Sequence, residues 1–237
     1  MHQLHPHTAI LLFLRDEQEE AHVKSFDKEL GVHSSMRVVH TLNRHLIRES
    51  RGSGLPVFTI SGDQQIGDSF GERFANAFET VFNAGFERVI ALGNDCLSLS
   101  KEHILRTEAL FREGHSVVLG PAKDGGAYLV GLDSQTFHRQ KFIELPWQTA
   151  QLLNALTEYA LRENVSCGLL PFASDFDDAN ALRRLLRRLP ATLRIVRLLR
   201  NIIFKNTFQP VVFTCFIISR FISANSLRAP PVLRFTV

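Results

Sequence analysis

The chain of 237 residues has few cysteines, no long apolar run and, after Asp178, no acidic residue. Its three cysteines form no CxxC pair and leave an odd count, which argues against a disulfide framework and favours reduced thiols in a cytoplasmic protein. No Ser-His-Asp arrangement and no zinc-like spacing of cysteine and histidine can be recognised. The sequence therefore gives no support for a hydrolase with a catalytic triad or for a structural zinc site. The remaining candidates for functional residues are carboxylates and basic side chains.

Charge is distributed very unevenly along the chain. All 24 acidic residues lie at or before Asp178, whereas 11 of the 27 basic residues follow it. The acidic body argues against nucleic-acid binding by the main domain. Residues 182–200 interleave leucines with arginine pairs, and residues 206–219, without any charge, are too short to span a bilayer. Two interpretations stay open: a basic amphipathic segment on an anionic membrane surface, or an apolar face packed on the body or on a second subunit.

Short apolar runs alternate with segments of helical period between residues 8 and 189. This alternation predicts an α/β, Rossmann-like, doubly wound and mostly parallel sheet, followed by a basic, helical C-terminal extension over residues 190–237. The predicted strands are 8–14, 56–60, 88–92, 116–120, 127–132 and 165–171. The predicted helices are 34–47, 69–84, 100–114, 134–139, 149–163 and 177–189.

Two of the predicted strands end on a glycine and then reach an acid. The run VIALGND leads to Asp95, and the run VVLGPAKDGG leads to Asp124. Open α/β sheets bind ligands at the carboxyl edge of their strands, so two acids there indicate a site for a metal and a phosphate. Magnesium needs only one or two carboxylates when substrate phosphates and water complete its shell. Gly125 and Gly126 lack a Cβ and would let the backbone approach a ligand, although a tight turn would also explain them.

Four further positions carry side chains suited to a phosphate or sugar ligand. Lys24 follows the first strand and is a candidate point charge on a phosphate. Arg73 opens the helix at 69–84, where it would clamp a phosphate or pair with an acid. Trp147, the single tryptophan, would cover a sugar or base, or fill the core. Asp177 follows the last strand and is a candidate helix cap, a third metal ligand or a contact to a substrate hydroxyl.

Several runs together resemble a bacterial family of glycosyltransferase-like proteins. The runs are GDSFGERFANAF, VIALGNDCLSL, VVLGPAKDGGAYLVGL, LPWQT and the DFDD segment. They are similar to members of the GT-A, or nucleotide-diphospho-sugar transferase, fold, some of them linked to arsenosugar synthesis. A more distant resemblance is to nucleotidyltransferases that make molybdenum-cofactor dinucleotides or guanylylate phospholactate. The similarity covers residues 8–189.

The resemblance implies a nucleotide-sugar donor, an acceptor hydroxyl and a divalent metal, magnesium or manganese, at Asp95. Asn94, Asp124 and the two glycines would line the donor or acceptor pocket. Asp124 or Asp177 would orient the acceptor or take its proton.

The chain departs from the family pattern near Lys24. The family shows Gly-x-Val-Lys-Thr-Arg-Leu, whereas this chain has EAHVKSF at residues 20–26, without the glycine and the arginine. Leu97 also stands where the family commonly has proline after Asp-Cys. Three functions therefore stay open: a metal-dependent glycosyltransferase, a nucleotidyltransferase that releases pyrophosphate, and a non-catalytic nucleotide-binding module.

Overall fold

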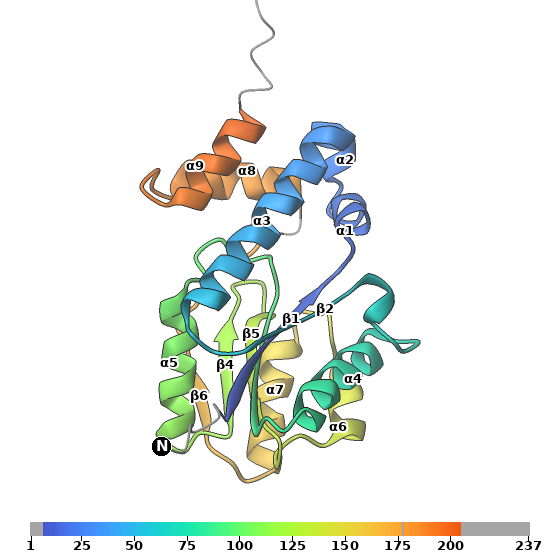
Figure 1. The fold of residues 1–237 in the computed structure, drawn as a ribbon, viewed down its shortest axis with the longest axis vertical. Coiled ribbons are helices and arrows are strands. Elements are labelled where there is room, and N and C mark those ends of the chain that lie inside the picture. The colour runs from blue at the N-terminus through green and yellow to red at the C-terminus, as the bar shows by residue number, and fades with distance from the viewer. Residues whose placement is uncertain (1–6, 177, 205–237) are drawn as a thin grey trace, which may run out of the picture. The chain divides into compact units, whose positions relative to one another are not determined.

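A six-stranded sheet forms the centre of the computed structural model, which describes residues 7–176 and 178–204. The strands lie in the order β2-β1-β3-β5-β4-β6 (Figure 1). β1 pairs in parallel with β2 and β3, and β4 pairs in parallel with β6, whereas β5 runs antiparallel to β3 and β4. The predicted α/β class with a mostly parallel sheet is therefore confirmed. The strands are β1 Thr8–Leu14, β2 Val57–Ser61, β3 Arg88–Leu92, β4 Val117–Pro121, β5 Ala127–Asp133 and β6 Cys167–Leu169.

Helices cover both faces of the sheet because its strands are apolar on both sides. Along β1, Ala9 and Leu11 face one cluster of buried side chains, and Ile10 and Leu12 face the other. The first face is covered by α4 (Phe70–Asn83), α6 (Arg139–Ile143) and α7 (Leu152–Arg162). The second face is covered by the carboxyl half of α3 (Val32–Gly52) and by α5 (Lys101–Arg112).

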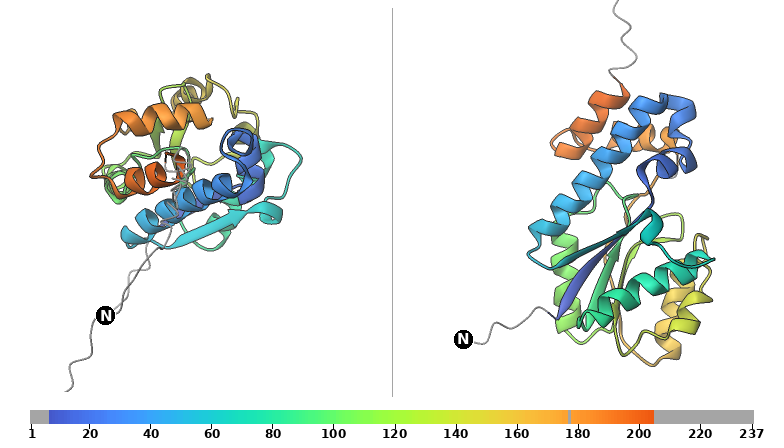
Figure 2. Two further views of the ribbon diagram at one scale, coloured as in Figure 1. Left: turned by 90° about the horizontal axis from the view of Figure 1, so that it is seen from above. Right: turned by 45° about the vertical axis from the view of Figure 1, so that its right-hand side comes forward.

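A third apolar cluster lies beyond the carboxyl ends of the strands. It joins the amino half of α3 to α1 (Glu17–Val23), α2 (Phe26–Leu30), α8 (Ala179–Arg188) and α9 (Arg194–Ile203) (Figures 1 and 2). α9 packs against both α3 and α8. The part of the predicted C-terminal extension that the structure describes, residues 190–204, thus buries its apolar face on the body of the protein. The remainder of that extension lies outside the described residues.

Local hydrogen bonding explains where the helices begin. Ser69 and Glu72 form a reciprocal capping box at the start of α4, and Ser100 caps α5 as its sequence predicted. α8 is capped by Asp178, whose carboxylate accepts from the backbone N–H of Ala181 at 2.6 Å. Asp177, the residue named as the alternative cap, lies outside the described residues.

Three of the predicted elements differ from those observed, and two helices were not predicted. The helix predicted at 34–47 is longer and spans Val32–Gly52 as α3. The helix predicted at 134–139 is wrong: these residues form a turn, because the Asp133 carbonyl accepts from the N–H groups of Thr136 and Phe137, and α6 begins only at Arg139. The charged segment 15–31, for which no helix was predicted, contains α1 and α2. β6 is shorter than predicted. None of the helices within residues 7–176 and 178–204 has the length and apolarity needed to cross a membrane.

Candidate functional site

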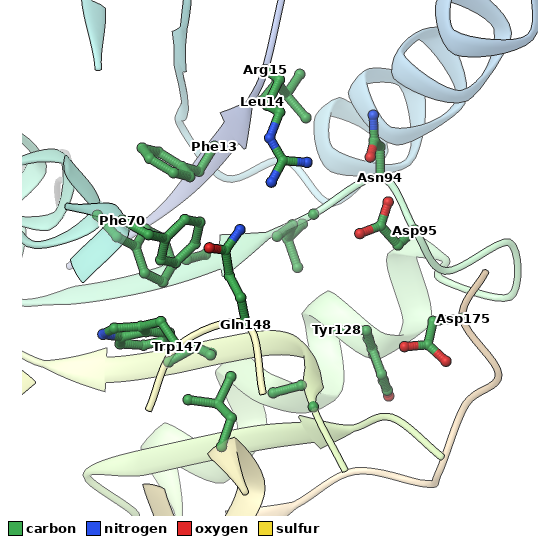
Figure 3. Close-up of a pocket in the computed structure, with 18 of the residues that line it drawn as sticks. Phe13, Leu14, Arg15, Phe70, Asn94, Asp95, Tyr128, Trp147, Gln148 and Asp175 are labelled. Atoms are coloured by element: carbon green, nitrogen blue, oxygen red, sulfur yellow. The ribbon is translucent and has the colours of Figure 1, made fainter. Parts of the chain in front are cut away.

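A pocket of about 920 Å³ opens at the carboxyl edge of the sheet, where the segments after β1 and β3 meet the turn between β4 and β5 (Figure 3). Because β5 is antiparallel, its first residues reach the same edge. The volume lies in the range of sites for cofactor-sized ligands. Seven of the predicted site residues line this pocket: Lys24, Arg73, Asn94, Asp95, Asp124, Gly126 and Trp147.

Asp95 is held by a buried lysine. Its side chain is 45% exposed, and its Oδ1 accepts a hydrogen bond from Nζ of Lys24 at 2.5 Å. Lys24 itself is only 4% exposed; its ammonium also donates to the carbonyl of Phe176 at 3.0 Å and lies over the Phe176 ring. An ammonium this deeply buried needs partners that replace its lost hydration. In this structure Lys24 therefore fixes the orientation of the Asp95 carboxylate.

Glu20 connects this pair to a second cation at the pocket. One Glu20 oxygen lies 3.5 Å from Nζ of Lys24, one helical turn away, and the other accepts from Arg15 at 3.1 Å. Glu20 is 4% exposed, whereas Arg15 is 31% exposed. Arg15 follows β1 directly, and Figure 3 shows its guanidinium extending toward the middle of the pocket. Charges of alternating sign thus run from Arg15 through Glu20 and Lys24 to Asp95.

The Asp124-Gly125-Gly126 turn forms the opposite wall and joins β4 to β5. Oδ1 of Asp124 accepts from the Gly126 backbone N–H at 2.8 Å, which is a local Asx-type turn. Gly125 adopts φ +94°, and a Cβ there would lie 2.2 Å from the Ala150 carbonyl oxygen. Gly125 does not line the pocket; it is needed for the turn and for its close approach to Ala150. The motif is thus both a tight turn and a part of the pocket wall, because the turn also presents Asp124 to the pocket.

Aromatic side chains form the wall of the pocket nearest α4. Trp147 packs on Phe70 and Phe74, with ring centroids 5.8 and 5.1 Å away, and its indole N–H donates to the carbonyl of Phe142 at 2.8 Å. Trp147 is therefore anchored as part of the core while one side borders the pocket. Gln148, the next residue, is exposed and has φ +62°, which is uncommon for a residue other than glycine.

Two further predicted residues, Arg73 and Asn94, have well-defined hydrogen-bond partners. Arg73 donates to the Gly67 carbonyl at 3.4 Å and, within the described part of the chain, forms no ion pair. Asn94 donates to the side-chain oxygen of Asn43 on α3 at 2.8 Å, which fixes the loop that carries Asp95. Asp177, predicted as a catalytic residue, lies outside the described residues.

Among the residues that border the pocket and that sequence reasoning missed are Arg15, Glu20, Tyr128 and Gln148. Burial is the main cause that raises the pKa of Tyr128, and nearby Cys96 adds to it. The Tyr128 hydroxyl donates to the Pro171 carbonyl at 3.1 Å, so the phenol stays protonated and structural. Burial likewise raises the pKa of the Cys96 thiol, which argues against a thiolate nucleophile beside Asp95. The sequence could have indicated Arg15, because it is a basic residue directly after an apolar strand.

The carboxylates of the pocket would suit one magnesium or manganese ion that is also bound by the phosphates of a ligand. Asp95 and Asp175 both line the pocket, and carboxylate oxygens are what magnesium and manganese prefer. Residues 7–176 and 178–204 contain no group of three or more histidine, cysteine or acidic side chains able to hold a metal by themselves. An ion here would need phosphate and water to complete its coordination.

The sheet order, the helices on both faces and the pocket at the carboxyl edge define an α/β protein with a ligand-sized site at the end of its strands. Residues 36–149 match the model of a family described as "Uncharacterized protein conserved in bacteria (DUF2064)". A search of curated proteins found no match.

Among solved structures, the chain is similar to a "putative nucleotide-diphospho-sugar transferase" from Desulfovibrio desulfuricans. The TM-score is 0.71 at 20% identity, over 84% of this chain and 98% of that one. This likeness shows the fold. A cytidylyltransferase from Leptospira borgpetersenii has a TM-score of 0.40 at 12% identity, over 86% of this chain and 96% of that one. A glycosyltransferase involved in glycosylation of the major capsid of PBCV-1 has a TM-score of 0.42 at 10% identity, over 68% and 81%.

Proposed function

We propose that the protein is a metal-dependent glycosyltransferase that moves a sugar from a nucleotide diphosphate to an acceptor hydroxyl. The observation that carries the proposal is the half-exposed Asp95 carboxylate, held by buried Lys24 at the end of β3 inside a pocket of nucleotide-sugar size. Similarity to a protein described as a nucleotide-diphospho-sugar transferase supports it.

Five charged side chains of the pocket have a role in this proposal. Asp95, with Asp175, would hold a divalent ion, which when bound neutralises charge on the leaving diphosphate. Arg15 and Arg73 supply positive charge to the same diphosphate from the other side of the pocket. The oxygen of Asp124 that is not used in the turn orients the acceptor hydroxyl. Asp177 stays a prediction for the same role.

Lys24 has a different part from the one its sequence position suggested. Its ammonium is committed to Asp95 and Glu20 and is 4% exposed, so direct contact with a phosphate would require it to leave both carboxylates. We assign it the positioning of Asp95, and we assign the gripping of phosphates to Arg15.

Isothermal titration calorimetry with a panel of nucleotide-sugars, with and without magnesium or manganese, tests the proposal. We expect metal-dependent binding that falls at least about tenfold in Asp95→Asn, since a carboxylate ligand is lost. Asp133→Asn makes the same chemical change at the far end of β5 and should bind as the wild type does. Absence of metal-dependent binding, or equal binding by Asp95→Asn, would contradict the proposal.

The products then distinguish glycosyl transfer from nucleotidyl transfer. A glycosyltransferase releases a nucleoside diphosphate, whereas a nucleotidyltransferase consumes a nucleoside triphosphate and releases pyrophosphate. Pyrophosphate exchange into the triphosphate would establish the second reaction in the same pocket. Binding without turnover of any donor would identify a nucleotide-binding module.

A further inference from the structure

Two helices after the sheet present arginines to solvent. On α8, Arg184, Arg187 and Arg188 are exposed, while Leu182 and Leu186 are fully buried. Spacings of three and four residues place the three arginines on one side of the helix. On α9, Arg194 and Arg197 are likewise exposed and three residues apart. We call these five arginines the basic face: Arg184, Arg187, Arg188, Arg194 and Arg197.

Within residues 7–176 and 178–204, the basic face has no acidic partner. No acidic residue follows Asp178 in the sequence, and none of the five arginines forms an ion pair within the described residues. Two neighbouring arginines show the contrast. Arg183 pairs with Glu29 at 2.6 Å, and Arg200 points inward, where it donates to the carbonyls of Leu186 and Leu189 at the end of α8. Arg187 also lies over the Phe204 ring, 5.9 Å from its centroid, but stays exposed. Internal ion pairs and hydrogen bonds thus account for Arg183 and Arg200 and leave the charges of the basic face to an external partner.

Apolar side chains lie among these arginines. Leu193 is 38% exposed and Leu198 40% exposed, both at or within α9. Arginines interleaved with exposed leucines are typical of helices that lie at a lipid interface, where the leucines enter the acyl boundary and the arginines meet headgroup phosphates. A nucleic acid would be attracted by the arginines alone and would make no use of the exposed leucines.

We propose that the basic face docks on an anionic lipid surface. The exposed Leu193 and Leu198 give the chain a second interfacial signal beside the arginines. Stable peripheral binding generally needs two such signals. α8 also begins directly after the segment that brings Asp175 to the pocket, so docking places the pocket close to molecules held at the lipid surface.

Vesicle co-sedimentation of the full chain tests this proposal. The probes are vesicles of phosphatidylcholine alone and of phosphatidylcholine mixed with phosphatidylglycerol. We expect sedimentation only with the anionic vesicles, and release at high salt because surface charges are then screened. Changing all five arginines of the basic face to glutamine should lower the partition coefficient on the order of a thousandfold, since each basic residue near an anionic surface contributes about fivefold.

A matched variant removes five exposed or half-exposed basic residues from the body instead: Arg106, Arg112, Arg139, Lys141 and Arg162. It makes the same change in net charge and should still sediment with anionic vesicles. Thermal unfolding of both variants establishes that they are folded.

Three results would overturn the proposal: no sedimentation with anionic vesicles, equal loss in both variants, or equal sedimentation with neutral vesicles. Binding of duplex DNA through the basic face without vesicle binding would assign the surface to nucleic acid instead. Asp95→Asn should sediment as the wild type does, so the outcome is independent of the chemistry of the pocket.

Discussion

Replacement of Lys24 by methionine separates a positioning lysine from a phosphate-binding lysine. The methionine side chain keeps most of the apolar stem, and so keeps its packing near Phe176, but removes the ammonium from between Glu20 and Asp95. A lysine that only grips a phosphate would leave the unliganded protein as stable as before. A lysine that neutralises buried carboxylates would not.

The structure sets the size of the expected loss. Removing one partner of a buried ion pair costs about 3–5 kcal/mol, because the other charge stays buried without compensation. Glu20 is 4% exposed but keeps Arg15 at 3.1 Å, and Asp95 is 45% exposed and is partly hydrated by solvent. Both facts place Lys24→Met at the lower end, about 3 kcal/mol of unfolding free energy. In Lys24→Met with Glu20→Gln, part of this loss should be recovered, since the buried charge without a partner is gone.

Urea unfolding at neutral pH, followed by circular dichroism, measures these differences. Lys28→Met is the matched control: Lys28 is an exposed lysine on α2, and its replacement should change stability by less than about 0.5 kcal/mol. A loss below about 1 kcal/mol in Lys24→Met, or no recovery in the double variant, would refute the positioning role. Weakened nucleotide binding at unchanged stability would restore the phosphate role predicted from the sequence.

Two further predictions concern the turn and the pH dependence of folding. Gly125→Ala should lower the unfolding free energy by about 3 kcal/mol or more, since φ +94° is combined with a Cβ at 2.2 Å from the Ala150 carbonyl oxygen. Gly54→Ala, at φ +80° with open space around the Cβ, should lose only about 1 kcal/mol in the same urea titration, and equal losses would contradict the steric argument. Burial lowers the pKa of His45 below its ordinary value of 6.5, so the unfolded chain takes up the proton first, and stability present above pH 6.5 is lost as the pH falls below it. Urea unfolding at a series of pH values should show a shallower loss in His45→Gln, and an unchanged slope would assign the pH dependence to other groups.

The strands and the two acids could be predicted because their signals are local. Apolar runs ending in Gly and Asp are visible in the sequence, and the carboxyl edge of a sheet brings them into one pocket whatever the loop lengths. The helix predicted at 134–139 was wrong because the Asp133 carbonyl turns the chain there, a local contact that helical periodicity does not reveal.

The role of Lys24 depends on a contact across the fold. Its partner Asp95 is 71 positions away, and the packing of α1 against α3 and Phe176 buries Lys24 and brings the two side chains together. Composition likewise located the arginine-rich end of the chain but could not say which arginines face outward. Arg183 and Arg200 differ from Arg184 and Arg197 only in where α8 and α9 place them.

The antiparallel strand β5 has a consequence for the order in which the sheet can assemble. Of the strand pairings in the described sheet, β4 with β5 alone is closed by a tight turn, while the others join segments separated by helices or by other strands. Closing a short loop costs far less chain entropy than closing a long one, so this hairpin can form before the sheet around it. The turn that presents Asp124 is then among the first parts of the pocket to take shape, and the Lys24–Asp95 contact among the last.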